Sequence, residues 1–98
     1  MHHYLLLVTY TLKDGAARED FIGEMRDSGL LDTIRSEPGC LEYEYFLSEE
    51  SERDVQLVEK WESPSHQQTH MRTEHMTGLF PEIKNKYVES TSVTEMQF

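Results

Sequence analysis

The sequence predicts a single α+β domain over residues 1–98, with the element order βαββαβ. Four strand-like runs alternate with two helical patterns, and 98 residues suffice for one core but not for two. With right-handed crossovers, this order gives a four-stranded antiparallel sheet with helices packed on one face, the ferredoxin-like arrangement.

The first predicted strand, residues 4–12 (YLLLVTYTL), is apolar on both faces, which is typical of a central strand covered on each side. His2 and His3 are expected to be its fraying start. Turn residues at 13–15 precede a helix whose inward stripe consists of Phe21, Ile22 and Met25. Ser28-Gly29 interrupts this stripe and predicts a bend, and Pro38-Gly39 ends the helix.

The second predicted strand, residues 40–47, alternates in hydrophobicity. The pattern places Leu41, Tyr43, Tyr45 and Leu47 on one face, opposite Cys40, Glu42, Glu44 and Phe46. Cys40 is the only cysteine, so an intrachain disulfide is excluded. We interpret it as a small, half-buried strand residue rather than a catalytic thiol. A polar hairpin loop at 48–54 follows.

In the third predicted strand, residues 55–61, Leu57, Glu59 and Trp61 share a face that is expected to turn inward. Ser63 is the predicted N-cap of the next helix, with Pro64 at its first position. We expect a main helix at 64–72, a shorter one at 75–86 and a last strand at 87–96.

Glu59 needs a partner, because an unpaired buried carboxylate is costly, and the following helical segment supplies His66, His70 and His75. The first two are spaced i, i+4 and could share a helix face. The zinc-protease pattern requires glutamate directly after the first histidine, where Gln67 stands. Three histidines and Glu59 could still form a site, but we expect no metal.

The formal net charge is −10, from 9 basic and 19 acidic residues. Such a chain lacks the basic patches of nucleic-acid binders and is repelled by anionic membranes. We find neither a long apolar run nor a leader pattern, so we expect a cytoplasmic location. Apolar side chains on both faces of the first three strands predict a homodimer, in which a second sheet covers the face that the helices leave bare.

The run 59–63 (EKWES), followed by His66, His70, Thr73 and His75-Met76, resembles the core motif of the antibiotic biosynthesis monooxygenase (ABM) family, especially the small bacterial quinol monooxygenases. The segment 37–40 (EPGC) and Tyr43 also fit, so the resemblance covers nearly the whole chain. Two departures are a longer first helix and Gln67-Gln68 where family helices often carry an aliphatic residue. They leave the substrate open.

The resemblance implies a dimeric α/β barrel of ferredoxin-like subunits, each with a pocket between sheet and helices. Many members oxygenate electron-rich aromatic substrates with O₂ and use neither metal nor flavin. We therefore expect a cofactor-independent monooxygenase of a small hydroxylated aromatic, such as a quinol or a polyketide-like phenol. The alternatives are an isomerase or ring-cleaving enzyme of the same fold, and a non-catalytic dimer that binds a small ligand.

We expect His70 and Glu59 to be the catalytic residues, because histidine can deprotonate a phenol near neutral pH and an acid behind it could hold the imidazole. The expected substrate-binding residues are Trp61, His75, Tyr43 and Tyr10, with Trp61 as a flat wall for an aromatic ring. Three of these residues also have a structural interpretation: Trp61 as core, Glu59 as a partner of a histidine or a helix cap, and His70 as a satisfied buried histidine.

Overall fold

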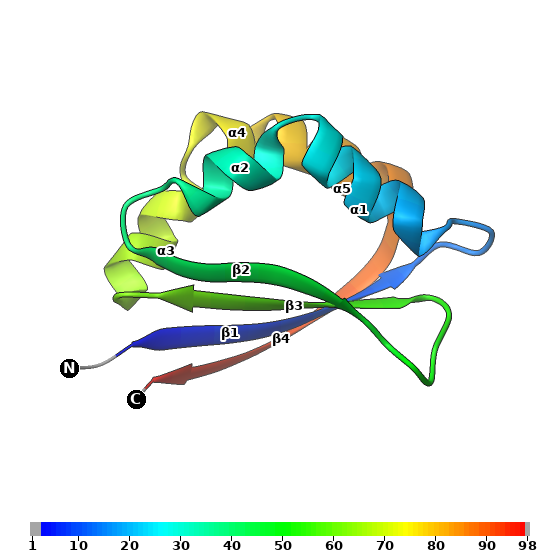
Figure 1. Cartoon of the computed structure of the whole chain (residues 1–98), viewed down its shortest axis with the longest axis horizontal. Helices are drawn as coiled ribbons and strands as arrows, with labels where there is room; N and C mark the ends of the chain where they lie inside the picture. Colours follow the sequence, from blue (N-terminus) through cyan, green and yellow to red (C-terminus); the bar gives the residue numbers. More distant parts are fainter. Residues whose placement is uncertain (1–2, 98) are drawn as a thin grey trace.

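A computed structural model describes residues 3–97 of the chain, with His2 outside the described part (Figure 1). It confirms the predicted ferredoxin-like fold. The sheet has the strand order β2-β3-β1-β4, and every neighbouring pair is antiparallel. The strands are β1 (Tyr4–Leu12), β2 (Cys40–Leu47), β3 (Asp54–Trp61) and β4 (Val88–Gln97). The helices are α1 (Arg18–Asp27), α2 (Leu30–Arg35), α3 (Pro64–Met71), α4 (Glu74–Thr77) and α5 (Leu79–Tyr87).

All the helices lie on one side of the sheet, and the core fills the space between the two layers (Figure 1). The central strand β1 buries every second side chain against the helices: Tyr4, Leu6, Val8, Tyr10 and Leu12. The intervening side chains lie on the opposite, outer face, where Leu7 is 41% exposed. Only one face of this strand is thus covered within the chain.

The predicted bend between the two parts of the first helical segment is confirmed. Gly29 takes a φ of 84° between α1 and α2, a conformation that favours glycine. Both parts contribute to the core through Phe21, Met25, Leu30, Leu31 and Ile34.

The predicted faces of β2 are wrong at its start, because the strand contains a β-bulge. Cys40 pairs with Trp61, yet the next pair along the strands is Glu42 with Lys60, so Leu41 is an extra residue. Residues directly opposite in an antiparallel pair share a face, which places Cys40 on the inner side beside Trp61. Leu41, expected to point inward, is 47% exposed.

The Ser63 cap is confirmed: its Oγ accepts a hydrogen bond from the backbone N–H of His66 at 3.3 Å. The single helix expected at 75–86 is instead two helices, α4 and α5, which meet at Gly78. Tyr87 ends α5 and does not begin β4. Within the described residues, none of the helices has the length and apolar character needed to cross a bilayer.

Candidate functional site

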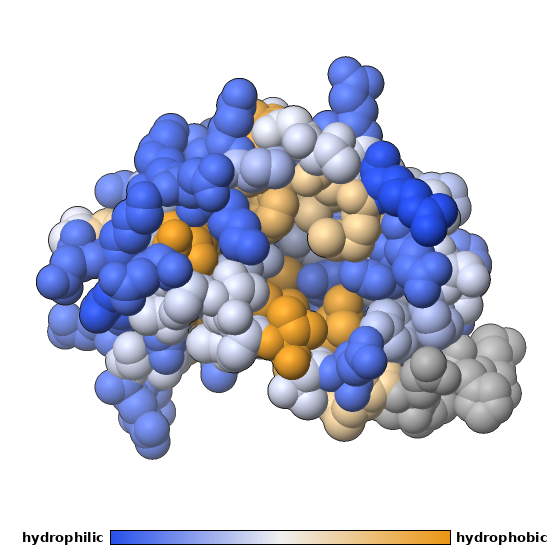
Figure 2. Space-filling model, turned by 180° about the vertical axis from the view of Figure 1, so that it is seen from behind, coloured by the Kyte–Doolittle hydropathy of each residue, from blue (hydrophilic) through white to orange (hydrophobic). Residues whose placement is uncertain are grey.

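A cavity of about 310 Å³ lies between the inner face of the sheet and the helices α3 to α5. Figure 2 shows apolar side chains gathered in a hollow between the helix layer and the sheet. Residues from β1, β2, β3 and β4 line the cavity together with helix residues, and they include Tyr4, Leu6, Tyr10, Tyr43, Glu59, His70, Met71, Met76, Phe80, Lys84 and Glu95. This cavity combines an apolar wall with buried ionisable groups, which is typical of a ligand site.

His70 on α3 is almost completely buried, with 1% of its surface exposed. Its Nδ1 lies 2.8 Å from Oε2 of Glu37, and its ring packs on Trp61 at a centroid distance of 4.7 Å. Burial lowers the pKa of His70, and the nearby Glu37 opposes this effect. The imidazole Nε2 is buried and has no hydrogen-bond partner among the described residues.

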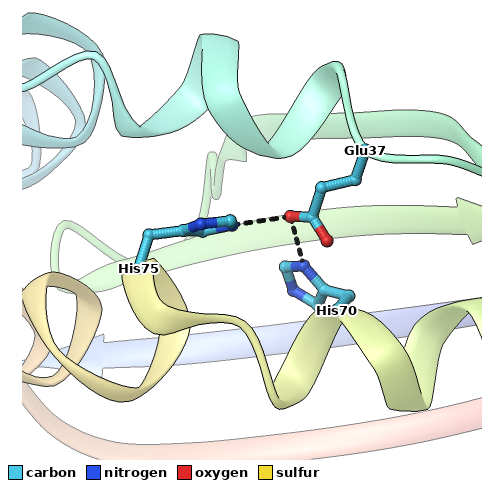
Figure 3. A group of neighbouring side chains, drawn as sticks. All are labelled: Glu37, His70 and His75. Atoms are coloured by element: carbon cyan, nitrogen blue, oxygen red, sulfur yellow. Dashed lines mark hydrogen bonds and ion pairs between the residues drawn. The ribbon is translucent and has the colours of Figure 1, made fainter.

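Glu37, in the turn after α2, contacts a second histidine through the same oxygen (Figure 3). Its Oε2 lies 2.9 Å from Nε2 of His75 on α4. Thr73, between the two helices, donates a hydrogen bond to the backbone carbonyl of His70 at 2.8 Å and lies 3.1 Å from Nε2 of His75. One acid therefore joins two histidines that are five positions apart in the sequence.

The carboxylate that holds the imidazole is Glu37, whereas the sequence led us to consider Glu59 for this contact. Glu59 is 6% exposed, and its Oε1 accepts a hydrogen bond from the indole N–H of Trp61 at 3.1 Å. Burial raises the pKa of Glu59 to about 7, with a smaller opposing effect from Trp61. Glu59 is thus a buried acid that keeps its proton more readily than an ordinary glutamate.

The six predicted site residues fall into two groups. His70, Glu59, Tyr43 and Tyr10 border the cavity, and burial raises the pKa of both tyrosines. Trp61 and His75 are not among its lining residues: Trp61 is fully buried against His70, and His75 lies on the other side of Glu37.

His66 is separate from this cluster. Its Nδ1 lies 2.7 Å from the hydroxyl of Ser63, and its Nε2 lies 3.8 Å from Glu62. The i, i+4 pair of histidines therefore does not form one site.

Sequence reasoning missed the contacts of Glu37 with the two histidines, because Glu37 was not among the predicted site residues. It also missed the contact at one end of the cavity, where the Tyr4 hydroxyl donates a hydrogen bond to Glu95 on β4. This bond is the largest contribution that raises the pKa of Tyr4 to about 12. A signal for Glu37 was present, because EPGC is one of the segments that fit the family pattern.

Among residues 3–97, Glu37, His70 and His75 each offer one atom that could ligate a metal ion, and these three atoms lie within 4.8 Å of one another. Both histidine nitrogens already point at a single carboxylate oxygen, at 2.8 and 2.9 Å. Hydrogen bonds satisfy these groups, and a cation could enter only by displacing the two ring protons. The absence of a metal stays a prediction, which elemental analysis after chelation tests.

Comparison with known structures agrees with this fold. The chain is similar to a protein from Shewanella oneidensis (24% identity, 99% of this chain and 91% of that chain covered, TM-score 0.84). It is also similar to one from Pseudomonas aeruginosa (23%, 98% and 93%, TM-score 0.82). A structure described as an antibiotic biosynthesis monooxygenase shares 25% identity, with 95% of each chain covered and a TM-score of 0.78.

Among curated proteins, none matches the chain. The sequence profile of the family described as "Antibiotic biosynthesis monooxygenase" matches residues 4–80, well over half of the chain. The chain belongs to the antibiotic biosynthesis monooxygenase family.

Proposed function

We propose that this protein is a cofactor-independent monooxygenase that oxidises a small hydroxylated aromatic, a quinol or a polyketide-like phenol, with O₂. The observation that carries the proposal is the bare Nε2 of His70, a buried acceptor without a partner beside a cavity with aromatic and aliphatic walls. A buried polar atom of this kind is costly unless a ligand satisfies it.

The proposed chemistry starts with proton transfer from a substrate hydroxyl to Nε2 of His70. The lowered pKa of His70 keeps the resting imidazole neutral and able to accept that proton. The phenolate then reduces O₂ directly. For a quinol, one oxygen atom enters the ring and the other leaves as water, and all four electrons come from the substrate, which becomes a hydroxyquinone. No outside reductant is needed.

Access to the buried Nε2 requires side chains near it to move. Met71 and Met76 line the cavity, and methionine is flexible enough to repack around a ligand. Glu59 borders the same cavity, and in its protonated form it offers an O–H donor to a substrate oxygen. The apolar walls exclude water from the phenolate.

The proposal includes a homodimer that forms through the outer faces of two sheets, as in an α/β barrel. Leu7 and Phe46 are exposed on this face, and they line a shallow hollow of about 390 Å³ together with Val58. Leu5 on β1 and Met96 on β4 extend the apolar surface across the sheet. A second sheet would remove these side chains from water.

Oxygen consumption with a panel of quinols tests the proposed reaction. The wild type should consume O₂ in a quinol-dependent manner, and a His70→Ala, Glu59→Ala double variant should not exceed the uncatalysed rate. Equal rates in the two proteins would refute the proposal for that panel. Saturable quinol binding without O₂ uptake would favour the non-catalytic binding protein, and a rearranged or cleaved product without O₂ uptake would favour the isomerase or ring-cleaving alternative.

A further inference from the structure

Glu37 makes an unusual pair of contacts, because a single carboxylate oxygen serves two imidazole rings. Its Oε2 lies 2.8 Å from Nδ1 of His70 and 2.9 Å from Nε2 of His75 (Figure 3). These distances are those of charge-assisted hydrogen bonds. The side chain of Glu37 is only 10% exposed, so water competes weakly for this oxygen.

The network determines which ring nitrogens carry protons. An ionised carboxylate has no proton to donate, so both of its contacts must be N–H donors. The hydroxyl of Thr73 already donates its single proton to the carbonyl of His70, and therefore it also accepts from Nε2 of His75. Neutral His70 consequently carries its proton on Nδ1, and its Nε2 is left with a free lone pair.

The backbone around Glu37 holds this acid in place. Cys40 donates a hydrogen bond to the carbonyl of Glu37 at 3.1 Å, and Glu62 donates one to the carbonyl of Gly39 at 2.9 Å. A Cβ on Gly39 would overlap the ring of His66, so only glycine lets the turn approach α3 this closely. The turn is thereby tied to the segment that carries His70.

We propose that Glu37 is the positioning residue of this site: it holds His70 in the Nδ1–H tautomer, so that the bare Nε2 is the atom offered to the ligand. His75 is the second donor, which keeps the shared oxygen oriented. This inference rests on the proposed function only in treating His70 as the base. The tautomer of His70 can be observed in the free protein, without any substrate.

Long-range ¹H–¹⁵N correlation spectra of the histidine rings at pH 8 test the tautomer directly, with His70→Asn and His75→Asn variants for assignment. In the wild type, His70 should show a protonated Nδ1 and an unprotonated Nε2, and His75 should show a protonated Nε2. Glu37→Leu should abolish this single tautomer at His70. Glu37→Gln keeps an oxygen acceptor, so it should retain the tautomer while lowering the pKa of His70 through the lost charge.

Glu62→Leu is the matched control, because it removes an acid near the half-buried His66 and should leave the His70 signals unchanged. If the proposed reaction holds, Glu37→Leu should also reduce quinol-dependent O₂ uptake by about 10²–10⁴-fold, the usual contribution of a positioned base. A wild-type His70 that is protonated on Nε2 would overturn the inference, even if Glu37→Leu failed to fold. So would an unchanged His70 tautomer in folded Glu37→Leu. Because the spectra need no turnover, a failure of the oxygenase proposal would remain separate from this result.

Discussion

Among residues 3–97, the one hydrogen-bond donor to the Glu59 side chain is the neutral indole N–H of Trp61. A single neutral donor replaces little of the hydration that an ionised carboxylate loses on burial. Desolvation therefore dominates and raises the pKa of Glu59 to about 7. Around neutral pH the cavity thus contains an acid that is partly protonated and a neutral imidazole. The first can donate a hydrogen bond to a ligand, and the second can accept one.

This burial makes stability depend on pH in a definite direction. The ordinary pKa of 4.5 applies to Glu59 in the unfolded chain, and the folded protein keeps the proton until about pH 7. The folded state therefore binds more protons between these values, and its stability falls as pH rises through this window. Glu59→Gln cannot ionise. The free energy of unfolding of Glu59→Gln minus that of the wild type should therefore increase by about 3 kcal/mol from pH 4.5 to pH 8.

Urea denaturation of both proteins across this pH range measures the difference. All other titrating groups are common to the two proteins and cancel in the comparison. A difference that stayed constant from pH 4.5 to 8 would mean that Glu59 ionises in the folded protein as it does in water.

At the scale of elements, the turn between α2 and β2 connects the fold to the site, because it positions Glu37. Gly39 in this turn takes a φ of 81° and packs against the ring of His66. Gly15 takes the same φ, but a Cβ there would meet nothing within 4 Å. Substitutions at these two glycines therefore distinguish the energetic cost of backbone strain from that of close packing.

Gly15→Ala should destabilise the protein by about 1–2 kcal/mol, the usual cost of a left-handed conformation for a residue with a Cβ. Gly39→Ala carries the same strain, and in addition its Cβ would lie 2.8 Å from the Cβ of His66. Its unfolding free energy should therefore fall by more than that of Gly15→Ala in parallel thermal or urea denaturation. Equal losses of unfolding free energy in the two variants would show that the contact with His66 does not destabilise Gly39→Ala.

The element order and the inward face of β3 could be predicted, because period-two alternation is a local property of the sequence. The bulge at Leu41 could not, since the alternation of β2 continues without a break through that residue. The break between α4 and α5 at Gly78 could not be predicted either, because whether residues 74–87 form one helix or two depends on packing. The partners of Glu37 lie 33 and 38 positions along the chain, so no local pattern pairs them with it.

At the scale of the whole molecule, the sheet has one face covered by helices and one that exposes apolar side chains. Leu7 lies near the middle of this outer face and is 41% exposed, and Leu79 is comparably exposed, at 37%, on α5 in the helix layer. A dimer that forms through the sheets should depend on the first of these leucines and not on the second.

Sedimentation velocity at micromolar concentration should find the wild type and Leu79→Lys as dimers. Leu7→Lys should be monomeric, because dimerisation would bury an unpaired ammonium group between two sheets. A monomeric wild type, or a Leu7→Lys variant that remains dimeric, would rule out this interface.

In the proposed reaction, the protein inserts oxygen into a hydroxylated aromatic without a cofactor, with His70 as the base. The most direct measurement is mass spectrometry of the product formed from a quinol under ¹⁸O₂ by chelator-treated enzyme. We predict one ¹⁸O atom in each product molecule, one O₂ consumed for each, and no product above the uncatalysed level with the His70→Ala, Glu59→Ala variant. A product without ¹⁸O, or one that the variant forms equally fast, would contradict the claim.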